Sequence, residues 1–388
     1  MNHTRASWTA WLWLGLWAAA CGGAAKSAEP TLRALPQANP RAVQKYLKAN
    51  ELAASGQPQS IDRAEALLRE ALLIDSYLWE AHYNLGVLYR RDGQLRKALG
   101  EFQDAHDTQP GATEPLLALA EVHATLGEPQ QASELLASYL ELDAEAPATR
   151  LAWTALLRMQ GSFDDALKQA RAVLVRDPKN TGALLEVGRI YRQRGEYDAA
   201  ELVFNRALAL DEKSPAPHNE LGLTHLARGD TQLAFSHFEH AIEADKTFAP
   251  ARMNRAVVLL RAGDYVAATR EYQSVLEQNP TLDDARVGLG VALRAQGKHA
   301  EAQEQYEQVL KRTPNQPAAL FDLGVLLAEF TDHRAQARPL IERFVDVSAE
   351  GPARTLAEGY LESIPKPEEP TPTPPPQQLP KPKTGAKK

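Results

Sequence analysis

Apolar and small residues recur along the chain at an interval of 34 positions. The segment Leu85-Gly86-x-x-Tyr89 has counterparts at residues 187–191, 221–225, 289–293 and 323–327. Two further series keep the same step, glycines at 93, 127, 161, 195, 229, 263 and 297 and alanines at 64, 98, 132, 166, 200, 234, 268 and 302. A period of this length indicates an array of similar units, each of which buries its apolar face against its neighbours.

The period and the pattern resemble the tetratricopeptide repeat (TPR), a helix-turn-helix unit. The resemblance implies an all-α fold, a solenoid of about nine units over residues 41–351 that coil into a right-handed superhelix. Units begin at positions 79, 113, 147, 181, 215, 249, 283 and 317, and a degenerate first unit begins near Ala42, with a three-residue insertion in its turn. Residues 352–364 have apolar side chains at helical spacing and predict a capping helix.

Two kinds of residue are expected to hold the units together. Small residues should lie where the two helices of a unit approach closely, at Gly86, Ala120, Gly188, Gly222, Ala256, Gly290 and Gly324. Aromatic residues recur at one position of the second helix and are predicted to fill the space between adjacent units: Phe102, Phe204, Phe238, Tyr272 and Tyr306.

The two ends of the chain differ from the repeats. Residues 1–20 combine one positive charge with a short apolar run, which predicts a secretory signal peptide. The sequence that ends at Cys21 resembles the lipobox of bacterial lipoproteins, although Ala18 stands where that family usually has leucine. The alternative is ordinary cleavage that leaves a free thiol. Residues 21–40 predict a flexible tether, and residues 365–388, with nine prolines and five lysines, a disordered tail.

Charge and cysteine content exclude several classes. The chain carries a net charge of -7, and residues 41–364 carry -12, which argues against a nucleic-acid partner. A single cysteine excludes an intramolecular disulfide. No phosphate-binding loop, nucleophile elbow or zinc-protease motif occurs, so we expect no enzyme, nucleotide, cofactor or metal. His237 and His240 are expected to be surface residues, and His218 and His225 to be part of the scaffold.

The resemblance places a partner-binding groove along the first helices of the units. The residues it assigns to this groove include Tyr83, Arg90, Arg158, Leu185, Arg189, Arg192, Met253, Val291, Arg294 and Phe321. The arginines would suit an extended peptide or helix with acidic and apolar side chains. The alternative is that they pair with glutamates on neighbouring helices. Under the first hypothesis, changing Arg189 and Arg192 to Glu should weaken partner binding and leave the melting temperature nearly unchanged.

Taken together, these features predict a protein-binding scaffold that is lipid-anchored at the outer membrane and faces the periplasm. The chain is similar to TPR lipoproteins of the Gram-negative envelope, both pilotin-like proteins and components of gliding motility. That similarity implies an assembly role in a machine of the gliding-motility or type IV pilus kind. The alternatives are a regulator of cell-wall synthesis enzymes and a periplasmic chaperone-like holder.

Overall fold

A computed structural model describes residues 37–54, 58–331, 333–348 and 351–364. Within these ranges it contains nineteen helices and no strands, which confirms the all-α prediction. The predicted signal peptide, Cys21, residues 55–57 in the turn of the first unit and the C-terminal tail lie outside the described residues. The helices are α1 Pro40–Ala54, α2 Pro58–Ile74, α3 Trp79–Arg91, α4 Leu95–Thr108, α5 Thr113–Thr125, α6 Pro129–Leu142, α7 Pro147–Met159, α8 Phe163–Arg176, α9 Thr181–Gln193, α10 Tyr197–Leu210, α11 Pro215–Arg228, α12 Thr231–Ala244, α13 Ala249–Ala262, α14 Tyr265–Gln278, α15 Asp283–Ala295, α16 His299–Arg312, α17 Pro317–Phe330, α18 Arg334–Val347 and α19 Pro352–Ser363.

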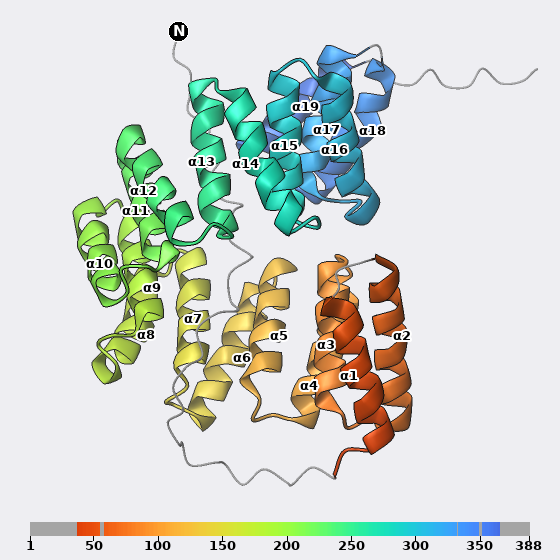
Figure 1. Cartoon of the computed structure of the whole chain (residues 1–388), viewed down its shortest axis with the longest axis vertical. Coiled ribbons are helices and arrows are strands. Elements are labelled where there is room, and N and C mark those ends of the chain that lie inside the picture. Colours follow the sequence, from red (N-terminus) through yellow and green to blue (C-terminus); the bar gives the residue numbers. More distant parts are fainter. Residues whose placement is uncertain (1–36, 55–57, 332, 349–350, 365–388) are drawn as a thin grey trace, which may run out of the picture.

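Consecutive helices pack as pairs, from α1 with α2 to α17 with α18, and each pair stacks on the next along a curved path (Figure 1). Several successive odd-numbered helices, such as α7, α9 and α11, also contact one another directly. Among the described residues, no two even-numbered helices make comparable contact. The odd-numbered helices therefore lie closer together and form what we call the inner face of the curved stack.

A glycine ends the first helix of most pairs. Gly93, for example, has a φ of 72°, in the left-handed region where a side chain would be strained. Its amide donates to the carbonyl of Arg90, and the next amide, of Gln94, donates to the carbonyl of Tyr89. These bonds satisfy carbonyls at the end of α3 and turn the chain toward α4. The 34-residue glycine series thus marks the turn within each unit.

An aspartate or asparagine ends the second helix of six pairs, and the sequence pattern had not singled it out. Asp177 illustrates the arrangement, because its carboxylate accepts a 3.0 Å hydrogen bond from the amide of Lys179. The equivalent residues, which make the same bond two positions on, are Asp75, Asp143, Asp211, Asp245 and Asn279. Such side chains fix the turn between units by replacing a backbone bond.

The small residues of the first helices make room for the recurring aromatic residues, as predicted. A Cβ on Gly222 would lie 2.5 Å from the ring of Phe238, and one on Gly188 would lie 2.4 Å from that of Phe204. Each of these pairs joins the two helices of a single unit. The rings also reach the next unit, as predicted, because Phe204 shares a buried cluster with Leu221 and Phe238 shares one with Val258. For four of the five aromatic residues, the glycine that makes room lies in the same unit.

Tyr272 is the exception. Its own unit has Ala256 at the position of the glycine, and its ring lies 2.4 Å from the place that a Cβ on Gly288 would occupy, in the next unit. The tyrosine is almost fully buried there. This contact joins α14 to α15, so the glycine that accommodates the ring has moved to the neighbouring repeat.

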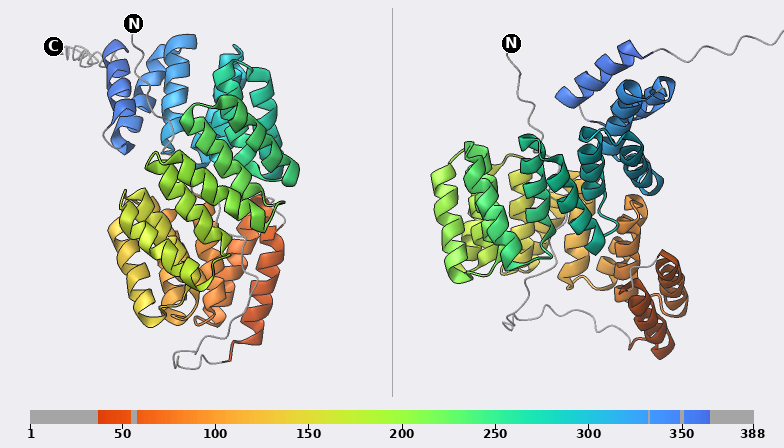
Figure 2. Two further views of the ribbon diagram at one scale, coloured as in Figure 1. Left: turned by 90° about the vertical axis from the view of Figure 1, so that its left-hand side faces the viewer. Right: turned by 45° about the horizontal axis from the view of Figure 1, so that its top comes forward.

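The curvature brings distant repeats together. A Cβ on Gly93, after α3, would lie 3.8 Å from the side chain of Thr313, after α16. Figure 2 shows the stack from two further directions, with α19 at its C-terminal end against α18. None of the described helices is long and apolar enough to cross a membrane.

Candidate functional site

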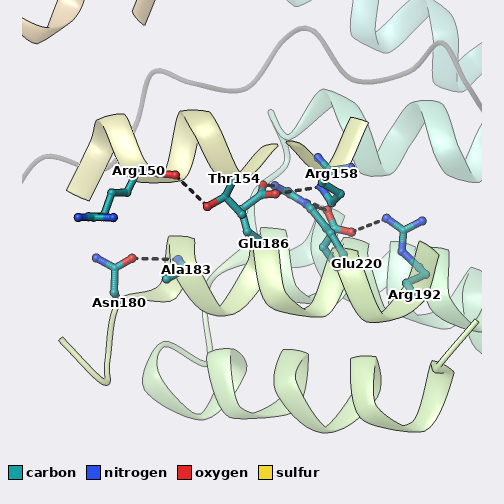
Figure 3. Close-up of polar contacts among 9 residues, drawn as sticks. Arg150, Thr154, Arg158, Asn180, Ala183, Glu186, Arg192 and Glu220 are labelled. Carbon is teal, nitrogen blue, oxygen red and sulfur yellow. Dashed lines mark hydrogen bonds and ion pairs between the residues drawn. The ribbon is translucent and has the colours of Figure 1, made fainter. Parts of the chain in front are cut away.

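Five charged residues on the inner face form a continuous series of ion pairs, which we call the ion-pair ladder. They are Arg158 on α7, Glu186, Arg189 and Arg192 on α9, and Glu220 on α11. Each glutamate accepts from two arginines (Figure 3). The ladder links three successive units, and it joins three cations to two anions, so one positive charge remains in excess.

The distances in the ladder are those of charge-assisted hydrogen bonds. Arg158 Nε lies 3.0 Å from Glu186 Oε2, and Arg189 Nη1 lies 2.5 Å from Glu186 Oε1. Glu220 accepts from Arg189 Nε at 2.8 Å and from Arg192 Nη2 at 3.1 Å. Arg192 Nε is buried and has no hydrogen-bond partner among the described residues.

The ladder is withdrawn from solvent. The side chains of Glu186 and Glu220 are 5% and 1% exposed. Burial acts to raise the pKa of Glu186, but the positive charges of Arg189 and Arg158 outweigh it and hold that pKa below its ordinary value. Burial opposes the charge of Arg189 as well, yet the two glutamates raise its pKa. Glu186 and Arg189 are therefore both charged at neutral pH.

Local helix chemistry places the ladder. Asn180 caps α9, because its side chain accepts from the amide of Ala183 at 2.9 Å. On α7, the hydroxyl of Thr154 donates to the carbonyl of Arg150 one turn earlier, which satisfies a buried polar group next to the ladder (Figure 3). Glu186 and Arg189 then stand three residues apart on one helix, where side chains meet.

Two other predicted groove arginines are also paired. Arg90 on α3 forms an ion pair with Glu121 on α5. Arg294 on α15 lies 3.5 Å from Asp322 on α17. All five predicted arginines thus pair with carboxylates on inner-face helices, which was the alternative hypothesis for them. These ion pairs argue against the expectation that Arg189 and Arg192 can become Glu without loss of stability, because the change would leave Glu186 and Glu220 buried among like charges.

The remaining predicted groove residues divide by burial. Met253 and Phe321 are each 7% exposed and belong to the hydrophobic core, and Arg158 is similarly buried, so these three offer little surface to a ligand. Tyr83, Leu185 and Val291 are half-buried. The structure therefore brings Arg158, Arg189 and Arg192 into one cluster and leaves the other residues distributed along the face.

The structure also brings four histidines together. His218 and His225 on α11 face His237 and His240 on α12, and the rings of His225 and His237 are stacked with their centroids 5.1 Å apart. His237 is half-buried, so the expectation that it is a surface residue was wrong. Burial, followed by the three neighbouring histidines, lowers the pKa of His237 to about 4.

Comparison with known families identifies the repeats. Two tetratricopeptide repeat models match, one at residues 89–152, 225–287 and 259–324 and the other at residues 46–113 and 151–215. Together they cover more than half of the chain. It belongs to the tetratricopeptide repeat family. Proteins of this family bind peptide or protein partners, and their fold is typically a non-enzymatic scaffold. A search of curated proteins finds no significant match to this TPR chain.

Several solved structures match this chain to different extents. A TPR protein from Parabacteroides merdae is 17% identical, with a TM-score of 0.52 over 66% of this chain and 100% of the other. Yeast Tom70 is 14% identical, with a TM-score of 0.47 over 83% of this chain and 95% of its own. YrrB, described as a TPR protein with an unusual peptide-binding site, is 22% identical, with a TM-score of 0.33 over 48% of this chain and 97% of its own.

The acidic partners in the TPR inner face were missed by sequence reasoning. Glu186, Glu220 and Asp322 occupy one repeat position, since they differ by multiples of 34. All three are buried. A carboxylate that recurs at a core position of a repeat was a signal of internal ion pairing, and it could have been found in the sequence.

Proposed function

We propose that this TPR protein is a scaffold or assembly factor that binds other proteins in a bacterial envelope machine of the gliding-motility or type IV pilus kind. It would be lipid-anchored at the outer membrane through Cys21 and face the periplasm. The signal-peptide pattern of residues 1–20 and the position of the single cysteine support this localisation. The repeat family supports the binding role.

The observation that carries the binding role is the composition of the inner face. Val257 on α13 and Val291 on α15 are half-buried and retain some exposed surface, and they occupy the same position in adjacent units. Neither is among the residues packed against the core clusters. They belong to the same face as the ladder, with its one excess positive charge. Such a face suits a partner segment that has apolar side chains and a few acidic ones.

The binding role is tested with the double variant Val257→Glu/Val291→Glu, which places negative charge on the inner face. The matched control, Leu202→Glu/Val266→Glu, changes two apolar residues on even-numbered helices that are 72% and 58% exposed. Each protein serves as bait in a crosslinking pull-down from the native envelope, followed by mass spectrometry. We expect the wild type and the control to recover a secretin or a motility-complex component and the inner-face variant to lose it.

Other recoveries would favour other functions. Specific recovery of a cell-wall synthase would replace the machine with regulation of wall synthesis. Recovery of many unrelated exported proteins would indicate a chaperone-like holder. If both double variants recover the same proteins as the wild type, the inner face is not the binding surface.

The anchor is tested separately. Cys21→Ser should move the protein from the membrane fraction to the soluble periplasm, because the substitution removes the thioether attachment of a lipid. A variant that fractionates like the wild type would show that Cys21 does not anchor the chain.

A further inference from the structure

Four of the ten histidines of the chain lie in one repeat, on facing helices α11 and α12. His237 and His240 are three residues apart and so share one face of α12. His218 on α11 lies against both, with ring centroids 5.8 Å from His237 and 5.4 Å from His240. Packing alone does not account for three imidazoles that converge in this way.

Two buried ring nitrogens of the cluster lack partners. The Nδ1 atoms of His218 and His237 make no hydrogen bond among the described residues, whereas His225 Nδ1 lies 3.9 Å from Asp230 Oδ2. A buried polar group without a partner destabilises the fold. A ligand that pairs with these nitrogens would remove that destabilisation.

We propose that His218, His237 and His240 form a binding site for a divalent transition metal of the Zn²⁺ class. One ligand nitrogen from each ring lies within 4.8 Å of the others. Tetrahedral Zn²⁺ with bonds of 2.0–2.1 Å needs nitrogen atoms ~3.3 Å apart, so modest ring rotations would close the site. Three neutral imidazoles suit Zn²⁺, Ni²⁺ or Cu²⁺ and disfavour Mg²⁺ or Ca²⁺, which prefer oxygen.

The surroundings fit this assignment. His240 is exposed, so a metal has a path from solvent and a fourth position open to water or to a partner's side chain. His225 is buried and stacks on His237 at an angle of 9° between the rings. It would hold that ring in place as a positioning residue.

A second group, His82, Glu101 and Asp104, provides a contrast. Its histidine already has a partner, because His82 Nδ1 lies 2.8 Å from Glu101 Oε2. Unlike the Nδ1 atoms of His218 and His237, the Nδ1 atom of His82 is therefore satisfied without a metal. It supplies a matched control, since His82 resembles His218 in lying half-buried on the first helix of a unit.

The test uses the full chain, purified without a histidine tag and dialysed against Zn²⁺, with bound metal measured by elemental analysis. We expect one Zn²⁺ that depends on the cluster, with affinity at least about tenfold lower in His240→Ala and in His218→Ala and unchanged in His82→Ala. Circular dichroism verifies that each variant is folded, and the exposed position of His240 makes its variant the safest. X-ray absorption should show imidazole nitrogens at 2.0–2.1 Å.

Two results would overturn the proposal. One is a wild-type protein that binds no Zn²⁺ at concentrations up to about 1 mM, the weak end of metal sites in proteins. The other is binding that His240→Ala and His218→Ala leave intact, which would place the metal elsewhere on the chain.

Discussion

The same repeat position carries a buried carboxylate in two regions of the inner face, and the two behave in opposite ways. In the ion-pair ladder, Glu186 is held by two arginines, and its pKa lies below the ordinary value in spite of burial. Near the C-terminal end, Asp322 pairs in the described part of the chain with Arg294 alone, at 3.5 Å, and burial raises its pKa to about 6. The number of cations within reach decides whether a buried acid is charged and stabilising or strained.

This contrast gives the two regions opposite responses to pH. Glu186 contributes stability that is present above its unfolded pKa and is lost as pH falls. Asp322 binds its proton more tightly in the folded state, so its contribution to the stability of the fold falls as pH rises from about 4 to 6. Acidification should therefore destabilise the ion-pair ladder and remove the destabilising charge of Asp322 in the C-terminal unit.

The strongest way to break the ladder is the double change Arg189→Glu/Arg192→Glu. It removes two cations and adds two anions beside Glu186 and Glu220, at a cost of more than about 5 kcal/mol, since losing one partner of a buried pair already costs 3–5 kcal/mol. Hydrogen exchange should show α9 and α11 unprotected. Protection equal to that of the wild type would mean that the ladder does not hold these units together.

A single change, Glu220→Ala, should cost about 3–5 kcal/mol, because Arg192 loses the only carboxylate with which it pairs in the described structure. Urea denaturation measures the loss. The control is Asp198→Ala, which removes a fully exposed partner of Arg228 and should cost less than about 1 kcal/mol. Equal losses in the two variants would contradict the special role of burial.

In contrast, Asp322→Asn is expected to increase the stability of the protein. At pH 7 it removes a buried carboxylate that the fold disfavours, so stability should rise by about 1–3 kcal/mol, with 1.36 kcal/mol per unit of pKa shift as the guide. At pH 4 the wild type and the variant should be nearly equal in stability. Urea midpoints at the two pH values test this, and a variant less stable than the wild type at pH 7 would refute it.

The smallest effect is expected for Arg294→Gln. This arginine is 23% exposed and its contact with Asp322 is long. Its loss should change stability at pH 7 by less than about 1 kcal/mol, because Asp322 can take up a proton instead. Titration of the Asp322 carboxyl by NMR should show its pKa rising further. An unchanged pKa would mean that the pair does not interact.

Periodicity predicted the helices and the turns because both depend on single residues that recur. Gly93 and its counterparts had to be glycine for the left-handed turn, so the fold was visible in one sequence. The ion pairs of the inner face were not visible in the sequence, because they depend on which side chains meet across units. Arg189 was visible as a candidate, but its contact with Glu220, 31 residues away, needed the geometry of the stack.

The histidine cluster shows a second limit. The spacing of His237 and His240 showed that they are neighbours on one helix. It did not show that His237 is half-buried and His240 exposed. His218 approaches them only because α11 folds back on α12 after the turn at Gly229. On a helix, neighbouring residues can lie on the buried and on the exposed side. A single sequence does not show which histidines lie on the buried side.

The contact between Tyr272 and Gly288 has a consequence for how such arrays can be rearranged. Most aromatic residues here fit a glycine of their own repeat, so this contact places no condition on which repeat comes next. Tyr272 needs a neighbour with glycine at the sixth position, and every other unit has a larger residue there, such as Asn84, Glu220 or Asp322. Residues 249–316 must therefore be transplanted, duplicated or lost as one block of two repeats.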